Sequence, residues 1–289
     1  MSNGIEVGSG GIGRVRQYYR ENQILYTLFW TERRALSMNV GLWTAGTRTR
    51  VRALENQNAL IGELLQPGPA DVVLDAGCGT GGTSIWLAGR FGSRVYGITL
   101  CERQAALATR YAGSRRVGDR VKFAVMDFTN AAFPDGSFSR VFASESVCHT
   151  EHKEQFVADA FRLLKPGGRL VVVDGFLRTH DLTERQRAPF VDWCEGWAVP
   201  NLATVEEFDS TLRRRGFDAV DFRDLTAYIL PSARRVYAWG LVSQPVVGLL
   251  RLLGLATATQ SGHAVACRRL HGLVTQHVCR FGVFSAIKP

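Results

Sequence analysis

The residues with the clearest chemical meaning form a glycine-rich loop, Asp75-Ala76-Gly77-Cys78-Gly79-Thr80-Gly81-Gly82. It follows the short apolar run Val72–Leu74, which we expect to be a buried strand. Gly77 and Gly79 remove side chains, so backbone amides can approach a ligand closely. No Gly-Lys-Ser/Thr follows, which excludes a phosphate-binding P-loop. With Gly82 the loop fits the GxGxxG pattern, so a dinucleotide must be weighed as the ligand.

The end of the next expected strand argues against a dinucleotide. An acidic residue that binds the ribose is expected there. This chain instead has Thr99-Leu100, and Glu102 comes three residues after Thr99. The loop therefore predicts a nucleotide-like ligand of another kind.

A second chemical cluster, Ser144–Thr150, follows the expected fourth strand, Val141–Ala143. Ligands of open α/β sheets bind beyond the carboxyl ends of the strands, so we expect this segment at the binding site. A carboxylate there is costly to desolvate, and Glu145 needs either a task or a partner, such as its own turn or an N-terminal arginine. We expect His149 to brace the site and predict no metal, because His149-x-x-His152 lacks a third ligand nearby.

The elements around these residues alternate between strand and helix. Further strands are expected at 94–98, 121–125 and 170–173, with helices at 83–91, 104–111 and 153–164. Such alternation predicts an α/β fold with a doubly wound, mostly parallel sheet covered on both faces. The glycine loop and the Glu145 segment then meet at one edge of the sheet.

The rest of the chain is expected to cover that edge. We divide it into a helical, aromatic N-terminal cap (1–65), a cofactor-binding core (66–180) and a C-terminal part (181–289). The C-terminal part is predicted to hold helices at 183–197, 232–255 and 264–278 and the final strands of the sheet at 217–225 and 281–287. Thr204-Val205-Glu206-Glu207 opens another helix with a capping box.

Four segments resemble the class I S-adenosylmethionine-dependent methyltransferases. VVLDAGCGTGGTSIWLA resembles their first motif, and GITLCERQAALA resembles the second motif of the sterol, cyclopropane-fatty-acid and tocopherol branch, in which threonine replaces the usual acid. Asp127-Phe128 matches the position that contacts adenine, and RLLKPGGRLVVVDGF resembles the strand-five segment. The resemblance covers about 71–176 and implies a Rossmann-like sheet with S-adenosyl-L-methionine as cofactor.

The same resemblance implies the cofactor contacts. Asp75 would order the loop, Gly77 and Gly79 would face the methionine part, and Gln104 would lie on the ribose side, although a solvated helix face is the alternative for it. Asp127 would contact adenine unless it caps a helix. The full expected cofactor-binding set is Asp75, Gly77, Cys78, Gly79, Thr99, Leu100, Gln104, Asp127, Phe128 and Ser144.

The Glu145 segment resembles the "EATCH" turn of sterol C-methyltransferases and the corresponding turn of geranyl diphosphate C-methyltransferase. Met38–Trp43, with Gly46-Thr47, resembles a degenerate "HxGYW…GT" segment of that branch, with Asn39 or Met38 in place of histidine. The resemblance implies an alkene acceptor, such as a prenyl diphosphate, a prenylated natural product or a sterol- or tocopherol-like lipid.

Methylation of an alkene creates a carbocation, which needs a dry pocket, aromatic rings and one base. We expect Glu145 as the base, with His149 beside it. The expected acceptor-binding residues are Tyr19, Trp30, Trp43, Phe176, Trp193, Trp197 and Arg48, with core packing as the alternative for each ring. A diphosphate would require arginines, with Mg²⁺ as a further cofactor, and the candidates are Arg33, Arg34, Arg48 and Arg50 unless they form a solvated helix face.

Composition limits the partners. Hydrophobic residues make up 46% and charged residues 21%, as in ordinary globular proteins, and the net charge of +9 comes almost wholly from arginine. The arginines are scattered, so we expect no nucleic-acid partner, and codon bias or an anionic small molecule accounts for the charge. Six cysteines without a CxxC pair predict a cytoplasmic protein. The apolar stretch 236–255 is interrupted by Gln244-Pro245 and Arg251, which predicts no membrane span, and a homo-oligomer is left open.

Three alternatives to C-methylation are left open. In an N- or O-methyltransferase of a hydrophobic secondary metabolite, Glu145 or His149 would deprotonate the nucleophile. An NAD(P)-binding oxidoreductase is more distant. A partner subunit that binds cofactor without turnover is disfavoured by the intact Glu145.

Overall fold

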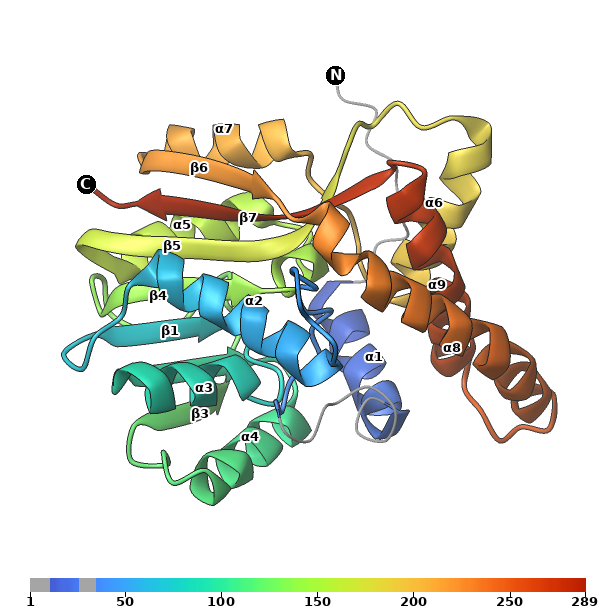
Figure 1. Ribbon diagram of the computed structural model, residues 1–289, viewed down its shortest axis with the longest axis horizontal. Helices are drawn as coiled ribbons and strands as arrows, with labels where there is room; N and C mark the ends of the chain where they lie inside the picture. Colours follow the sequence, from blue (N-terminus) through green and yellow to red (C-terminus); the bar gives the residue numbers. More distant parts are fainter. Residues whose placement is uncertain (1–10, 26–34) are drawn as a thin grey trace.

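The computed structural model describes residues 11–25 and 35–289, and this part of the chain is built around a seven-stranded sheet (Figure 1). The strands are β1 Val72–Ala76, β2 Arg94–Thr99, β3 Val121–Val125, β4 Phe138–Ser144, β5 Leu164–Leu177, β6 Asp218–Asp224 and β7 Cys279–Ile287. Their order is β3-β2-β1-β4-β5-β7-β6. Strands β1 to β5 are parallel, whereas β7 runs antiparallel between β5 and β6. The predicted Rossmann-like sheet is confirmed.

The helices cover both faces of this sheet. They are α1 Gly11–Leu25, α2 Arg50–Leu65, α3 Gly82–Phe91, α4 Glu102–Ser114, α5 Lys153–Leu163, α6 Glu184–Gly196, α7 Val205–Arg215, α8 Thr226–Leu252 and α9 Ala258–Thr275. Helices α2 and α3 pack on one face, α5 and α7 on the other, and α4 packs against β2 and β3. Helix α2 contacts β4 and β5 directly, although we assigned it to the cap; the three-part division of the chain remains a prediction.

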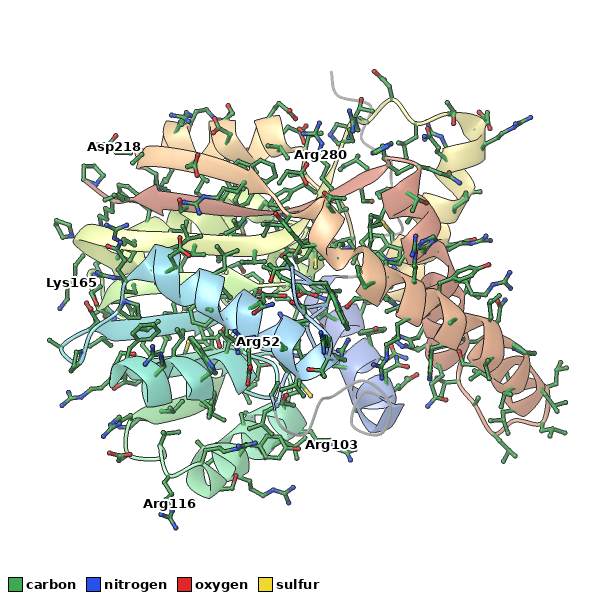
Figure 2. All side chains as sticks on the ribbon, viewed as in Figure 1. Arg52, Arg103, Arg116, Lys165, Asp218 and Arg280 are labelled. Carbon is green, nitrogen blue, oxygen red and sulfur yellow. The ribbon has the colours of Figure 1, made fainter. Side chains whose placement is uncertain are left out.

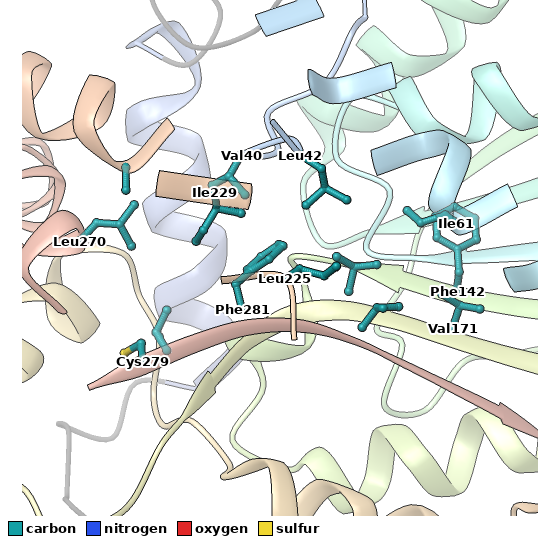
Figure 3. Close-up of a cluster of buried hydrophobic side chains, with 14 of the residues drawn as sticks. Val40, Leu42, Ile61, Phe142, Val171, Leu225, Ile229, Leu270, Cys279 and Phe281 are labelled. Carbon is teal, nitrogen blue, oxygen red and sulfur yellow. The ribbon is translucent and has the colours of Figure 1, made fainter. Parts of the chain in front are cut away.

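Two packed cores follow from the alternation of side chains along the strands. Phe142 and Val171 face the α2 side, whereas Val141 and Val172 face the α5 side. On the α2 side the core continues from Ile61 past Leu225 to Ile229 of α8 and Leu270 of α9 (Figure 3). The C-terminal helices are therefore tied to the sheet by the same apolar cluster.

Local signals explain several boundaries. Thr204 accepts a hydrogen bond from the Glu207 N–H at 3.1 Å, and the Glu207 carboxylate accepts one from the Thr204 N–H at 2.9 Å, which confirms the predicted capping box. Strand β5 begins at Leu164, so the segment 165–168, expected to precede the strand, lies within it. Helix α8 begins at Thr226, before the expected start at Ser232, and continues through Pro231.

Helices α8 and α9 form a hairpin that projects from the sheet (Figure 1). Helix α1 packs against α9, where the Tyr18 hydroxyl and His263 Nδ1 lie 2.8 Å apart. In residues 11–25 and 35–289 no helix combines the length and apolar character needed to cross a bilayer.

Candidate active site

A cavity of about 340 Å³ lies at the carboxyl edge of the sheet. Its floor is formed by the ends of four strands, through Asp75, Thr99, Ser144 and Asp174. Its walls come from α1, the segment 35–40, α6, α8, α9 and the start of β7. This is the edge at which α/β sheets bind ligands, and the volume suits a small molecule.

The glycine loop adopts a backbone that favours glycine. Gly77 and Gly79 have φ of 100° and 52°. A Cβ on Gly77 would lie 2.3 Å from Ser146 Cβ, and one on Gly79 would lie 3.1 Å from Met38 Cε. Below the loop, Asp75 accepts a hydrogen bond from Ser84 Oγ at 2.5 Å, and burial raises the pKa of this carboxyl to about 7. The loop therefore presents backbone to the cavity on a buried polar support.

The side-chain amide of Gln104, which we expect on the ribose side of the cofactor, is a buried hydrogen-bond donor without a partner among the described residues. Gln104 accepts a hydrogen bond from Thr99 Oγ1 at 2.8 Å, while its Nε2 has no partner in the described part of the chain. Gln104 is only 2% exposed, so the solvated helix face considered for it is wrong. An unpaired amide donor on the cavity wall fits a ligand oxygen. These residues therefore fit a cofactor with a ribose.

All ten expected cofactor-binding residues line the cavity. Asp127 and Phe128 are part of its lining, and the Asp127 carboxylate also accepts a hydrogen bond from the Thr129 N–H at 2.9 Å. Asp127 thus caps its own turn and still faces the cavity. The individual contact roles remain predictions.

Glu145 lies on the floor of the cavity, with φ of 53°, and its partners come from distant segments. The Val40 N–H donates to its two carboxylate oxygens at 3.0 and 3.2 Å, and Gln57 Nε2 donates to one of them at 2.9 Å. Burial raises the pKa of Glu145 to about 7, although Gln57 and Val40 act in the opposite direction. Among the described residues, these hydrogen bonds of Glu145 are therefore neither with its own turn nor with an arginine.

Gln57 is a site residue that sequence analysis missed. Its Oε1 accepts a hydrogen bond from the Gly41 N–H at 2.9 Å, and its Nε2 also donates to Ser144 Oγ at 3.0 Å. Asn39 Nδ2 donates to the same Ser144 oxygen at 2.8 Å. The available signal was an amide within the otherwise apolar stripe of α2, between Ala53 and Ile61.

His149 is partly buried, lines the same cavity as Glu145 and contacts Tyr19 of helix α1. Its Nδ1 lies 3.2 Å from the Ala198 carbonyl oxygen. Because this oxygen can only accept a hydrogen bond, the imidazole proton is on Nδ1. Nε2 then accepts from the Tyr19 hydroxyl at 3.0 Å. Burial lowers the pKa of His149, although the Ala198 carbonyl and Asp174 act in the opposite direction, so the ring is neutral near pH 7.

Asp174, also missed, holds the turn that carries these residues. Its carboxylate accepts hydrogen bonds from the N–H groups of Ser146 and Cys148, each at 3.1 Å, and from the N–H group of Gly175 at 2.8 Å. Burial raises the pKa of Asp174. The sequence feature that could have identified Asp174 as a site residue is its position directly after the apolar run 170–173. Across the described ranges, no three His, Cys, Asp or Glu side chains group as metal ligands.

The expected acceptor-binding residues divide into two groups. Tyr19, Trp193 and Trp197 line the cavity, and the last two rings lie 5.6 Å apart between centroids. The buried indole N–H of Trp193 has no hydrogen-bond partner among the described residues. Trp30 lies outside the described residues.

Trp43, Phe176 and Arg48 do not line the cavity, which corrects these expectations. Phe176 follows the strand alternation of Val172 and packs against Phe208 and other rings on the α7 side of the sheet. Trp43 donates its indole N–H to Ser232 Oγ at 2.8 Å and thereby ties its loop to α8. Arg48 is exposed in the turn before α2.

The described lining carries more carboxylates than cations. Arg280 is the one Arg or Lys in it, whereas its acidic residues are Asp75, Asp127, Glu145, Glu151 and Asp174. Arg50, considered for a diphosphate, instead donates to the Asn39 carbonyl at 3.0 Å and lies behind the wall. Arg33 and Arg34 lie outside the described residues.

Comparison with known proteins shows which family the chain resembles. A family model described as a methyltransferase domain matches residues 74–172. The chain is 31% identical over 230 residues to the 2-methyl-6-phytyl-1,4-hydroquinone methyltransferase of Synechocystis sp., covering 76% of this chain and 69% of that one. It is 28% identical over 235 residues to the O-methyltransferase resE of Aspergillus sclerotiorum, covering 81% and 88%.

Among solved structures, the [4+2]-cyclase SpnF has the same fold, with a TM-score of 0.77 over 98% of each chain at 22% identity. These relatives and the glycine loop establish the family of the chain. It belongs to the class I S-adenosylmethionine-dependent methyltransferases, in the branch that includes the tocopherol and sterol methyltransferases. This membership overturns the oxidoreductase alternative.

Proposed function

We propose that the protein methylates an alkene carbon of a neutral, hydrophobic isoprenoid or prenylated acceptor, with Glu145 as the base. The observation that carries the proposal is a partly buried carboxylate of raised pKa in the lining of a largely apolar cavity that also contains the glycine loop. An alkene offers no acidic proton at the start of the reaction. A base is needed only after the methyl group has been added.

The shape and charge of the cavity support a neutral acceptor. Apolar and aromatic side chains, among them Tyr19, Trp193 and Trp197, form much of the lining. The described lining offers a single guanidinium, that of Arg280, which disfavours a diphosphate and its Mg²⁺. A relative whose name specifies a phytyl hydroquinone agrees with a prenylated, uncharged acceptor.

S-adenosylmethionine supplies an electrophilic methyl group when it is bound. The acceptor π bond would form the new C–C bond as the sulfur–methyl bond breaks, which would leave a tertiary cation on the acceptor. The aromatic wall faces that cation and excludes water. Glu145 then takes a proton from the adjacent carbon, an alkene is restored, and the carboxyl returns the proton to solvent.

O- or N-methylation is the second candidate, and the His149–Tyr19 pair favours it. The partly buried imidazole is neutral, so it can take a proton directly or through the Tyr19 hydroxyl at 3.0 Å. A relative named as an O-methyltransferase agrees with this alternative. The two candidates differ in which atom receives the methyl group.

The deciding experiment is incubation with methyl-labelled S-adenosylmethionine and an acceptor panel. Prenylated indoles, tocopherol precursors, sterols and prenyl diphosphates are tested with and without Mg²⁺, and products are analysed by mass spectrometry and NMR. The proposal expects a new C–C bond on a neutral prenyl group without Mg²⁺. A methyl on oxygen or nitrogen, or turnover only of a diphosphate, would contradict it.

A further inference from the structure

The outer face of α8 carries a row of exposed apolar side chains. Val242, Val246, Leu249 and Leu253 are 70%, 55%, 58% and 63% exposed. Their spacing of four, three and four residues places them on one helical face, which we call the outer stripe. The opposite face packs on α9, where a Cβ on Gly240 would lie 2.9 Å from the Arg268 backbone nitrogen. The outer stripe therefore points away from the rest of the hairpin.

The turn after α8 extends this apolar surface. Leu252 and Leu255 are 86% and 72% exposed, and the hairpin that carries them projects beyond the sheet (Figures 1 and 2). Contiguous exposed apolar side chains of this kind mark a contact surface, since a protein that meets only water gains nothing from them.

The charge of the same region indicates what the surface contacts. Residues 225–289 contain no Asp or Glu and seven cations: Arg234, Arg235, Arg251, Arg268, Arg269, Arg280 and Lys288. Arg235 lies seven residues before Val242, on the same helical face, and both Arg234 and Arg235 are exposed.

The acidic groups that face the hairpin come from other elements. Glu21 of α1 accepts a hydrogen bond from the Thr257 hydroxyl at 2.6 Å, and Asp192 of α6 forms a salt bridge with Arg269 at 2.8 Å. Both lie on the side toward α1 and α6. A second copy of the stripe would bring like charges together, whereas an anionic surface is complementary.

We propose that the outer stripe, together with Arg234 and Arg235, binds the surface of an anionic lipid bilayer. The apolar side chains would enter the boundary between headgroups and acyl chains, and the guanidinium groups would bind lipid phosphates. At the other end of the hairpin, Ile229 and Leu270 line the cavity. A hydrophobic acceptor dissolved in the membrane would thus reach the cavity along the hairpin. Only this last step rests on the proposed function.

The test is flotation of the full-length protein with vesicles of phosphatidylglycerol and phosphatidylcholine in equal amounts, compared with phosphatidylcholine alone. We expect binding to the anionic vesicles that weakens with salt. The triple variant Val246→Gln/Leu249→Gln/Leu253→Gln should bind roughly tenfold or more weakly, because its apolar anchor is lost. These side chains are exposed, so calorimetry with S-adenosylhomocysteine should show unchanged cofactor binding.

The cation arm of the test has a matched control. Arg234→Gln/Arg235→Gln should weaken vesicle binding by roughly tenfold. Arg90→Gln/Arg110→Gln, on exposed faces of α3 and α4, should leave it unchanged. An equal loss of vesicle binding in both double variants would show that the effect depends on net charge alone. It would overturn the assignment to the outer stripe with Arg234 and Arg235.

Two other outcomes overturn the proposal. The first is wild-type protein that does not float with anionic vesicles. The second is an oligomer, seen by light scattering, that the triple variant dissociates while vesicle binding is absent; the stripe would then be an interface between copies. If the wild-type protein bound anionic vesicles but showed no C-methylation, this would contradict only the proposed function.

Discussion

At the scale of single residues, the site depends on the protonation of Glu145. Its partly buried carboxyl accepts hydrogen bonds from a backbone amide and the Gln57 amide, and its pKa is raised to about 7. A base must be unprotonated to act. The activity of this carboxylate should therefore change within the ordinary range of pH.

We expect kcat/KM to rise with pH through about 7 and then level off, because deprotonation of Glu145 supplies the base. Glu145→Gln keeps the shape but removes basicity, so turnover should fall about a hundredfold to ten-thousandfold and the rising limb should disappear. The measurement is a pH–rate profile with calorimetry of S-adenosylhomocysteine as a check on cofactor binding. A near-normal rate with the same product would make Glu145 structural and His149 the next residue to test.

Gln57 is expected to act through Glu145 as a positioning residue. Gln57→Leu removes the donor at 2.9 Å, so kcat should fall roughly tenfold and the midpoint of the rising limb should move to higher pH. The matched control is Gln155→Leu on the exposed face of α5, which should alter neither quantity. A midpoint that stays at the wild-type pH would show that Gln57 supports packing alone.

At the scale of elements, the β1–α3 turn sets how close the cofactor can lie. Valine at position 79 would have to adopt φ near 52° and place its Cβ 3.1 Å from Met38. We expect Gly79→Val to weaken S-adenosylhomocysteine binding by roughly tenfold or more, as a β-branched residue is strained there and fills ligand space. Calorimetry on a variant with a wild-type circular dichroism spectrum measures this, and unchanged affinity would contradict the assignment.

Helix α1 is expected to serve the acceptor and not the cofactor. It supplies Tyr18 and Tyr19 to the cavity, whereas Leu36 and Met38 contact the glycine loop. Deletion of residues 1–25 should therefore abolish turnover while S-adenosylhomocysteine binding persists. A truncated protein with full activity would show that α1 is not part of the acceptor site.

At the scale of the whole molecule, carboxyls whose pKa is raised link folding to pH. Burial raises the pKa of Asp75 and Glu145 to about 7, from ordinary values of 3.8 and 4.5. Between those ordinary values and 7 the folded chain binds more protons than the unfolded chain. This contribution to the free energy of unfolding is complete below about pH 4 and is lost as pH rises through 7.

We expect Glu145→Gln to flatten this dependence. Without cofactor, the wild-type protein should lose more of its free energy of unfolding between pH 5 and pH 8 than the variant does, by up to about 3 kcal/mol. Urea titrations at the two pH values measure the difference. Equal losses in the two proteins would show that Glu145 is already ionised at pH 5 in the folded state.

The sequence by itself determined the order of strands and helices and the cofactor loop. Periodicity and consecutive motifs are local properties, so the glycine loop at 75–82 and the acids and amides after β2, β3 and β4 could be placed at one edge of a parallel sheet. All ten residues predicted to bind the cofactor line the cavity for this reason.

The tertiary structure decided which side chains share the acceptor space. Phe176 is one residue from a cavity-lining glycine, yet strand alternation sends its ring into the core under α7. The partners of Glu145, Val40 and Gln57, are 105 and 88 residues away in the chain, so no local pattern connects them. Which residues meet there depends on how α2 and the segment before it pack on the sheet, and that packing is a property of the whole fold.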